Sequence, residues 1–269
     1  PMAFAGCAAL EQVLSGIDKP TARVVGASFA GLTPEHADLA FDVEVSNPYG
    51  VALPLTDVSY ALDSGGSTFA SGQAASAGSI PAKGRKTVTL PVRVGFAQTL
   101  KTLQGVRPGA VIPYRAQLSL KGNAPGIGAV SLPVSKSGEL PIPTVPEVEL
   151  VGIQWDELSL QRASAVATLR LKNTNDFAVD LSRLGYDLSL GGRSVADASV
   201  SQPPSLKPGQ GGTLTLPLSI RPIDAGVAFF NLLRGSDAAY QIRGTMEATT
   251  PFGPLSLPFD RSGDVPFRR

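Results

Sequence analysis

The chain of 269 residues contains one cysteine and one histidine, and these two shortages exclude several kinds of site. A structural zinc site takes about four Cys or His ligands, and activation of a serine nucleophile usually needs a histidine base. One cysteine also leaves no disulfide framework within the chain. His36 stands in a polar stretch beside Glu35 and is interpreted as a solvated loop residue. We therefore expect no catalytic residue, no metal and no cofactor.

Charge of one sign is also lacking, because the net charge is only +1. A nucleic-acid-binding surface would need clustered Lys and Arg with stacking aromatic residues, and the sequence has no such cluster. No run of apolar residues is long enough for a membrane-spanning helix. Disordered chains combine low hydrophobicity with high net charge, whereas 43% of these residues are hydrophobic. The composition predicts a folded protein that does not bind nucleic acid.

The clearest secondary-structure signal is a stretch of alternating residues that begins at Ala37. The apolar positions of this stretch are Leu39, Phe41, Val43 and Val45. Their period of two predicts a half-buried β-strand. Asn47 and Pro48 end the strand, because proline lacks the N–H that a sheet would use and restricts the residue before it. An apolar pattern resumes at Leu53, so a strand, a turn and a second strand are predicted.

The same pattern occurs twice in the chain, at a spacing of 126 residues. Matching residues are Asn47 and Asn173, Tyr60 and Tyr186, Tyr114 and Tyr240, and the dipeptides Val25-Gly26 and Val151-Gly152. The spacing falls to 125 near the end, where Ser137-Gly138 corresponds to Ser262-Gly263. This period is far longer than the roughly 20–50 residues of a solenoid repeat. The chain is therefore predicted to contain two copies of one domain.

The strand, the Asn47-Pro48 break and a second strand that ends in Tyr60-Ala61-Leu62 resemble the late embryogenesis abundant group 2 family, also called the WHy domain. The resemblance covers nearly the whole chain as two copies. The second copy departs from the family pattern, with Asn173-Thr174-Asn175 in place of Asn-Pro. The resemblance implies a sandwich related in shape to fibronectin type III and an association with desiccation and similar stress.

Each copy is predicted to be an antiparallel β-sandwich of about seven strands with one short helix. The helices are expected over 97–104 and 224–233, where apolar residues recur every three or four positions. Pro91 and Pro217 lie at matching places within strand patterns, so both strands are expected at a sheet edge or a bulge. The predicted parts are a lipobox remnant and tether at 1–21 and sandwich domains at 22–143 and 147–267.

Phe4-Ala5-Gly6-Cys7 resembles a bacterial lipobox, in which small residues precede a cysteine that is acylated. The alternative is a free thiol in a flexible arm. Six residues cannot hold a signal peptide, so an upstream segment is expected. The motif predicts a lipid anchor at Cys7 that holds the protein to a membrane of the bacterial cell envelope. We expect it to face the periplasm, at the outer membrane in preference to the inner.

Two groups of candidate site residues follow from these patterns. Asn47, Pro48 and Asn173 are interpreted as turn residues, because Asx side chains bond the following backbone. Trp155, Phe229 and Phe230 are the candidates for an apolar ligand site, although such residues more often belong to a core.

Two functions stay open. The first is a non-catalytic, envelope-anchored protein of stress tolerance that acts as a protective or interaction module. The second is a module that binds or transfers a lipid or another apolar ligand at the envelope. Either reading allows a lipid or protein partner there, and the sequence does not identify it.

Overall fold

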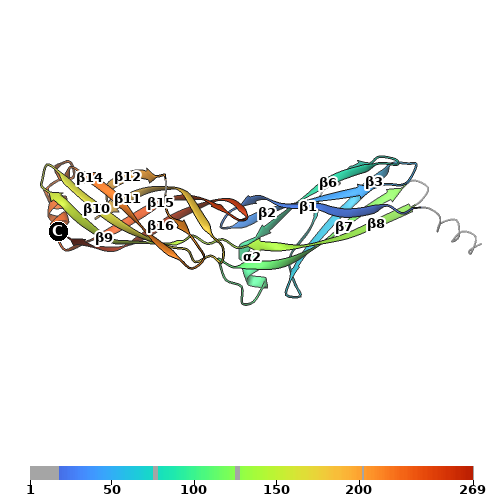
Figure 1. Ribbon diagram of the computed structural model, residues 1–269, viewed down its shortest axis with the longest axis horizontal. Helices are drawn as coiled ribbons and strands as arrows, with labels where there is room; N and C mark the ends of the chain where they lie inside the picture. The colour runs from blue at the N-terminus through green and yellow to red at the C-terminus, as the bar shows by residue number, and fades with distance from the viewer. Residues whose placement is uncertain (1–17, 75–77, 125–127, 202, 269) are drawn as a thin grey trace, which may run out of the picture. The chain divides into compact units, whose positions relative to one another are not determined.

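The computed structural model describes residues 18–74, 78–124, 128–201 and 203–268, most of them in antiparallel β-strands (Figure 1). The chain divides into two compact units. Unit 1 contains the described residues up to Ala30 together with 37–105 and 112–140, and unit 2 contains 31–36, 106–111 and the residues from Pro141 onward. The predicted fold class, mainly β with two tandem domains, is confirmed.

Unit 1 is built from two sheets. The first has the order β1 (Thr21–Leu32), β2 (His36–Ser46) and β6 (Arg85–Gly95). The second has the order β4 (Ser67–Ala74), β3 (Leu53–Ser64), β7 (Val111–Ala124) and β8 (Gly128–Pro141), with β5 (Ser79–Ile80) paired to β3. Helix α2 (Phe96–Thr102) follows β6 directly and precedes β7.

Unit 2 repeats this strand order. Its strands are β9 (Glu147–Leu158), β10 (Ala163–Lys172), β11 (Val179–Leu190), β12 (Arg193–Val200), β13 (Ser205–Leu206), β14 (Gly211–Ile220), β15 (Asp237–Thr250) and β16 (Gly253–Arg268). Hydrogen-bonded neighbours follow the order β12-β11-β15-β16-β9-β10-β14, and β13 pairs with β11. Helices α3 (Pro222–Ala225) and α4 (Val227–Leu233) lie between β14 and β15 in the chain, at the place that α2 has in unit 1.

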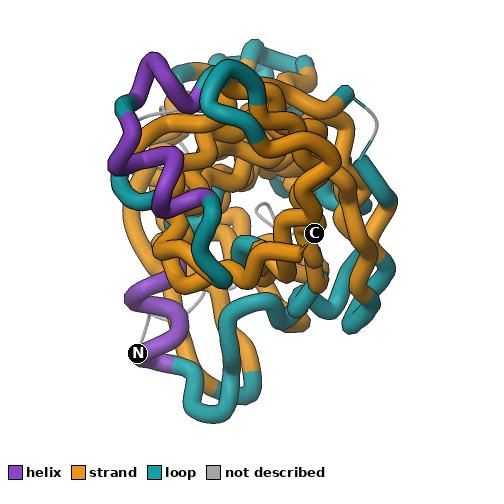
Figure 2. Tube along the Cα trace, turned by 90° about the vertical axis from the view of Figure 1, so that its left-hand side faces the viewer, coloured by secondary structure: helices purple, strands orange, loops and turns teal. Residues whose placement is uncertain are grey.

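The core of each unit follows from the alternation in its strands. Along β2 every second residue is buried, and Phe41, Val43 and Val45 have no exposed surface. The same alternation buries the apolar face of β10, from Ala163 to Leu171. Strands that bury one face and leave the other to water are typical of antiparallel sheets. Figure 2 shows the helices, in purple, as short pieces outside the strands, in orange.

The two repeated prolines lie where a sheet tolerates them. Strand β6, with Pro91, ends the order β1-β2-β6, and β14, with Pro217, ends the order of unit 2. An edge strand has a side on which no ladder hydrogen bond is required, so the missing proline N–H costs little. The prediction that both strands are edges is confirmed.

The repeated Val-Gly dipeptide marks a β-bulge. In unit 2, Leu150 pairs with Leu169 and Gly152 pairs with Thr168, so Val151 is an extra residue on its strand. A bulge of this kind adds one residue to one strand and increases its local twist. In unit 1 a Cβ atom on Gly26 would lie 3.0 Å from the carboxylate of Asp42, which favours glycine at the matching position.

Two features of unit 2 differ from the prediction. The helix expected over 224–233 is two helices, because Gly226 has a φ of 93°, which no α-helix accommodates. The pairing is also not wholly antiparallel, since Phe267 and Arg268 pair in parallel with Ile153 and Gln154 and join the two sheets. No helix among the described residues is long and apolar enough to cross a membrane.

Candidate functional site

Asn47 organises the turn between β2 and β3, and it is buried with 1% of its surface exposed. Its Oδ1 accepts a hydrogen bond from the backbone N–H of Tyr49 at 3.0 Å, as expected of an Asx turn. Its Nδ2 lies 2.8 Å from the carbonyl oxygen of Val51 and 3.3 and 3.0 Å from those of Ile80 and Pro81. The side chain therefore fixes the turn and also ties it to the segment around β5, 33 residues further on.

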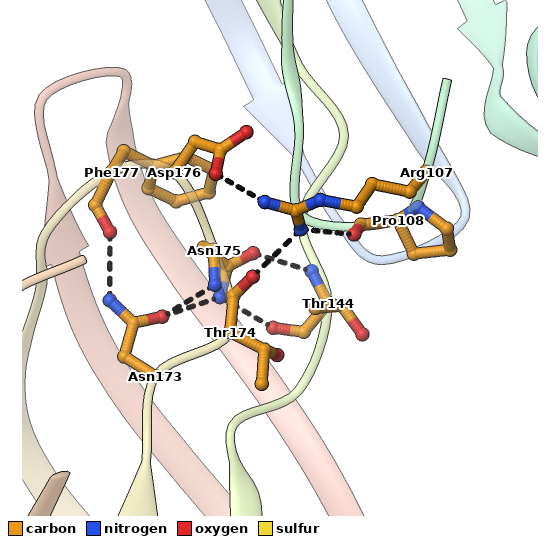
Figure 3. Close-up of polar contacts among 8 residues, drawn as sticks. All are labelled: Arg107, Pro108, Thr144, Asn173, Thr174, Asn175, Asp176 and Phe177. Atoms are coloured by element: carbon orange, nitrogen blue, oxygen red, sulfur yellow. Dashed lines mark hydrogen bonds and ion pairs between the residues drawn. The ribbon is translucent and has the colours of Figure 1, made fainter. Parts of the chain in front are cut away.

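Asn173 makes the corresponding bonds in unit 2, where it is fully buried (Figure 3). Its Oδ1 accepts from the N–H of Asn175 at 3.0 Å, and its Nδ2 donates to the carbonyl oxygens of Phe177 at 2.8 Å and Leu206 at 3.0 Å. Leu206 belongs to β13, the counterpart of β5. The two asparagines thus make equivalent hydrogen bonds in the two repeats, and each joins its turn to a short strand further along the chain.

Asn175, in the segment Asn173-Thr174-Asn175 that departs from the family pattern, has its own role in unit 2. Asn175 stands where unit 1 has Tyr49, and it is 1% exposed. Its Oδ1 accepts from the backbone N–H of Thr144 at 2.8 Å, and its Nδ2 donates to the Thr144 carbonyl at 2.9 Å (Figure 3). Nδ2 also lies 2.9 Å from Oδ1 of Asn173. One side chain amide therefore holds a backbone residue of the proline-rich segment 141–146 through two bonds.

Arg107 adds a second set of bonds to the same region of unit 2. Its guanidinium pairs with the carboxylate of Asp176 and donates to the carbonyl oxygen of Thr174 at 3.0 Å (Figure 3). The backbone N–H of Asp176 donates to the Gly109 carbonyl at 2.7 Å. An exposed ion pair contributes only about 0–1 kcal/mol, so the backbone bonds and Asn175 matter more here. The Asn-Thr-Asn departure was the one sign in the sequence that this turn has extra partners.

The three candidate apolar-site residues are placed in two different settings. Trp155 is 5% exposed and packs edge-on against Phe267, with ring centroids 5.7 Å apart. Phe229 is buried on the inner side of α4, whereas Phe230 is half-buried and has the guanidinium of Arg234 5.8 Å from its ring centroid. Trp155 Nε1 is buried and has no hydrogen-bond partner in the described part of the chain. Such an unpaired donor is costly, because it has lost water without a replacement.

Two surface hollows share a pair of corresponding strands, β3 and β7 in unit 1 and β11 and β15 in unit 2. The first, of about 640 Å³, is lined by residues of β3, β7 and β8 that include Ser59 and Ser119. The second, of about 560 Å³, is lined by residues of β11, β12 and β15 that include the matching Gly185 and Thr245. Ser, Gln and Arg side chains line the first hollow together with Ala61, Leu118, Pro133 and Val134, and Asp, Arg, Ser and Thr side chains line the second together with Tyr186 and Ala198. Both linings are therefore mixed, and neither includes Trp155, Phe229 or Phe230.

Shifted pKa values occur at Arg93, Tyr114 and Tyr186. A hydrogen bond from Arg93 to Asp38, 2.6 Å long, raises the pKa of Arg93. Burial raises the pKa of Tyr114 and of Tyr186, which keeps both phenols neutral. His36 Nδ1 lies 3.2 Å from the hydroxyl of Thr33. Among the residues with described positions, no group of three or more His, Cys, Asp or Glu could hold a metal ion. Cys7 lies outside the described residues.

Comparison with known proteins gives a consistent result for both repeats. The family model of the late embryogenesis abundant protein matches residues 42–138 and 168–263. A desiccation-related protein of Arabidopsis thaliana is 30% identical over 132 residues, which cover 49% of this chain and 80% of that protein. A desiccation protectant protein of Glycine max is 29% identical over 135 residues, which cover 50% and 89%. The solution structure of the Arabidopsis protein covers 51% of this chain and 79% of its own, with 29% identity and a TM-score of 0.41.

Proposed function

Because this chain belongs to the late embryogenesis abundant protein family, we propose that it is a non-catalytic protective or interaction module in the tolerance of desiccation and related stress. The observation that carries the proposal is the match of the family to both repeats, together with relatives that are named for desiccation.

The packing of the two units favours this function over a lipid carrier. A carrier needs an apolar pocket of roughly 300–1,000 Å³. Here the large inward side chains pack on one another, and Phe41, Leu62, Leu118, Leu169 and Leu184 are all at most 2% exposed. The hollows of comparable size lie open on the sheet surfaces and have mixed polar and apolar linings, whereas a carrier encloses most of its ligand. The unpaired Nε1 of Trp155 is the one feature that a bound ligand with an acceptor group would explain.

We also propose that Cys7 carries a lipid anchor in the bacterial cell envelope, with both units facing the periplasm. This part rests on the sequence Phe4-Ala5-Gly6-Cys7. An anchored module would act close to the membrane surface, where loss of water brings bilayers and proteins together. The partner at that surface would be a lipid or a protein.

The experiment that tests the function is deletion of the gene followed by drying or osmotic shock of the cells. We expect lower survival than in the parent strain, equal growth without stress, and recovery of survival when the wild-type gene is restored. Phospholipid extracted from the purified native protein would be measured alongside. Unchanged survival, together with lipid bound at a fixed ratio of molecules, would instead make the protein a carrier.

A further inference from the structure

Basic residues gather at the end of unit 1 where β1 and β6 begin. A hollow of about 420 Å³ at this end is lined by both Arg23 and Arg85, and Arg23 pairs with Glu44 at 2.9 Å. Lys19 stands just before β1, and Lys83 stands just before β6. Lys19, Lys83 and Arg85 are exposed, and none of them forms an ion pair with a residue whose position the structure describes. We call these three residues the basic end of unit 1.

The positive charge of this end remains when all the neighbouring segments are counted. Residues 18–25, 42–58, 78–87 and 119–131 meet here through the sheet pairings, and they contain six basic and four acidic residues. Three of the acidic residues have partners, which are Arg23 for Glu44, Lys121 for Asp57 and the Thr89 hydroxyl for Asp42. Residues 1–17 add one acidic residue, Glu11, and no basic one. The balance therefore stays positive, and three of its cations are unpaired.

Unit 2 does not share this charge. Its corresponding segments, which are 144–151, 168–184, 204–213 and 245–257, contain four basic and five acidic residues. Gly209 and Gly211 stand there in place of Lys83 and Arg85. Lys83 has a φ of 52° and Gly209 has a φ of 68°, so both turns use the left-handed conformation that favours glycine. Unit 1 thus has a lysine where its backbone favours glycine, which points to a role for the lysine's charge.

We propose that the basic end docks unit 1 on an anionic phospholipid surface. The described chain begins at Asp18, at this same end, and Cys7 lies 11 positions before it. Eleven residues span at most about 40 Å, so an acylated Cys7 would keep this end near the lipid headgroups. Lysine and arginine are attracted to the phosphates of such a surface. The choice of this occupant rests on the proposed anchor; a second copy is a poorer occupant, because two basic ends would repel each other.

Vesicle binding of the unacylated chain tests the proposal without the anchor. The full chain with Cys7→Ser is mixed with vesicles of phosphatidylcholine alone or with an equal amount of phosphatidylglycerol. We expect weak binding to the anionic vesicles only, and less of it as ionic strength rises, because salt screens the cations. Replacing Lys19, Lys83 and Arg85 together by Gln should lower the affinity at least about twentyfold, because each cation near an anionic surface contributes about fivefold.

The matched control removes three other cations of unit 1, with Lys101→Gln, Arg115→Gln and Lys136→Gln. All three residues are exposed and lie toward the opposite ends of their strands, or on α2 after β6. This triple variant has the same net charge as the test variant and should lose less than about threefold in affinity. Circular dichroism should show that both triple variants are folded.

A second readout locates the contact. Val51 is 39% exposed, and its carbonyl and that of Pro81 accept from the same Asn47 amide, so Val51 lies beside the turn that holds Lys83. A fluorophore on Val51→Cys, in the Cys7→Ser background, should be quenched by vesicles with spin-labelled headgroups. One on Ala97→Cys, at the start of α2, should be quenched less.

Two results would overturn the proposal: no binding to anionic vesicles, or an equal loss of affinity in the two triple variants. Binding of double-stranded DNA in place of vesicles, lost in the test variant, would assign the basic end to nucleic acid instead. The anchor is checked separately by mass spectrometry of Cys7. An unmodified Cys7 with the expected vesicle results would refute the anchor and still support the docking.

Discussion

At the scale of single residues, buried amides hold the turns of both units. Asn47 and Asn173 each replace water with hydrogen bonds to several backbone groups of the turn and of the segment beside it. Removal of such a side chain leaves buried carbonyl and N–H groups unsatisfied, which costs about 1–3 kcal/mol for each group. We therefore expect Asn47→Ala to lower the free energy of unfolding of unit 1, and Asn173→Ala that of unit 2, by at least about 1 kcal/mol.

Urea unfolding followed by circular dichroism measures these losses. Asn123→Ala in unit 1 and Asn231→Ala in unit 2 are suitable controls, because both side chains are exposed. A result in which Asn47→Ala keeps its unfolding midpoint but abolishes a binding activity would assign this residue to a ligand instead of the turn.

At the scale of elements, the repeated Tyr and Gly residues form pairs across neighbouring strands. Tyr240 is directly opposite Gly263, and the matching Tyr114 lies over Gly138 in unit 1. A Cβ atom on Gly138 would be 2.7 Å from the Tyr114 hydroxyl oxygen and 2.8 Å from the ring carbon that bears it. Tyr114 is itself held edge-on by Phe41, with centroids 6.3 Å apart. The ring has little freedom to move away.

Gly138→Ala should therefore lower the melting temperature of unit 1, with a cost of about 1–3 kcal/mol that is typical of overpacking. The same substitution in a Tyr114→Ala background should cost much less, because the obstructing ring is gone. Gly50→Ala serves as the control, since its Cβ would meet nothing within 4 Å. Equal effects of Gly138→Ala in both backgrounds would mean that the glycine has another role, such as a backbone conformation.

The elements also show how far local patterns can predict the fold and the candidate site. The fixed spacing predicted the duplication, because it can be read directly from the sequence. Alternation predicted the strands, and Pro91 and Pro217 predicted two edges, because these signals depend on one residue and its immediate neighbours. The parallel pair at Phe267 was not predicted, since two residues carry no period. Gly226 looked like a residue within one helix, and only its φ shows the break.

The site was predicted in part for a similar physical reason. The bonds of Asn47 to Tyr49 and of Asn173 to Asn175 are local, so the sequence indicates them. The bonds of Asn47 to Ile80 and of Asn173 to Leu206 join residues about 30 positions apart and depend on the tertiary fold. The same holds for the bonds between Asn175 and Thr144. Trp155 and the phenylalanines were grouped by their apolar character, whereas the structure gives Trp155 and Phe230 different aromatic and cationic partners.

At the scale of the whole molecule, duplication has kept one architecture while the surfaces of the two units have diverged. The strand order is shared, and so are the asparagine turns. The helices differ, because α2 exposes Ala97, Gln98 and Lys101, whereas α3 and α4 expose Ile223 and Val227.

The proposed anchor at Cys7 leads to the final prediction. Each buried CH₂ of an acyl chain contributes about 0.8 kcal/mol, so two or more chains on Cys7 would anchor the protein almost irreversibly. With the complete reading frame expressed in a bacterial host, the wild type should therefore fractionate with membranes, and Cys7→Ala should move to the soluble periplasm. Ala9→Ser, which keeps the cysteine, should remain with membranes, and mass spectrometry should find acyl chains on its Cys7 peptide. Equal partition of the wild type and Cys7→Ala into the soluble fraction would refute the anchor, and equal retention on membranes at high salt would assign the attachment to other residues.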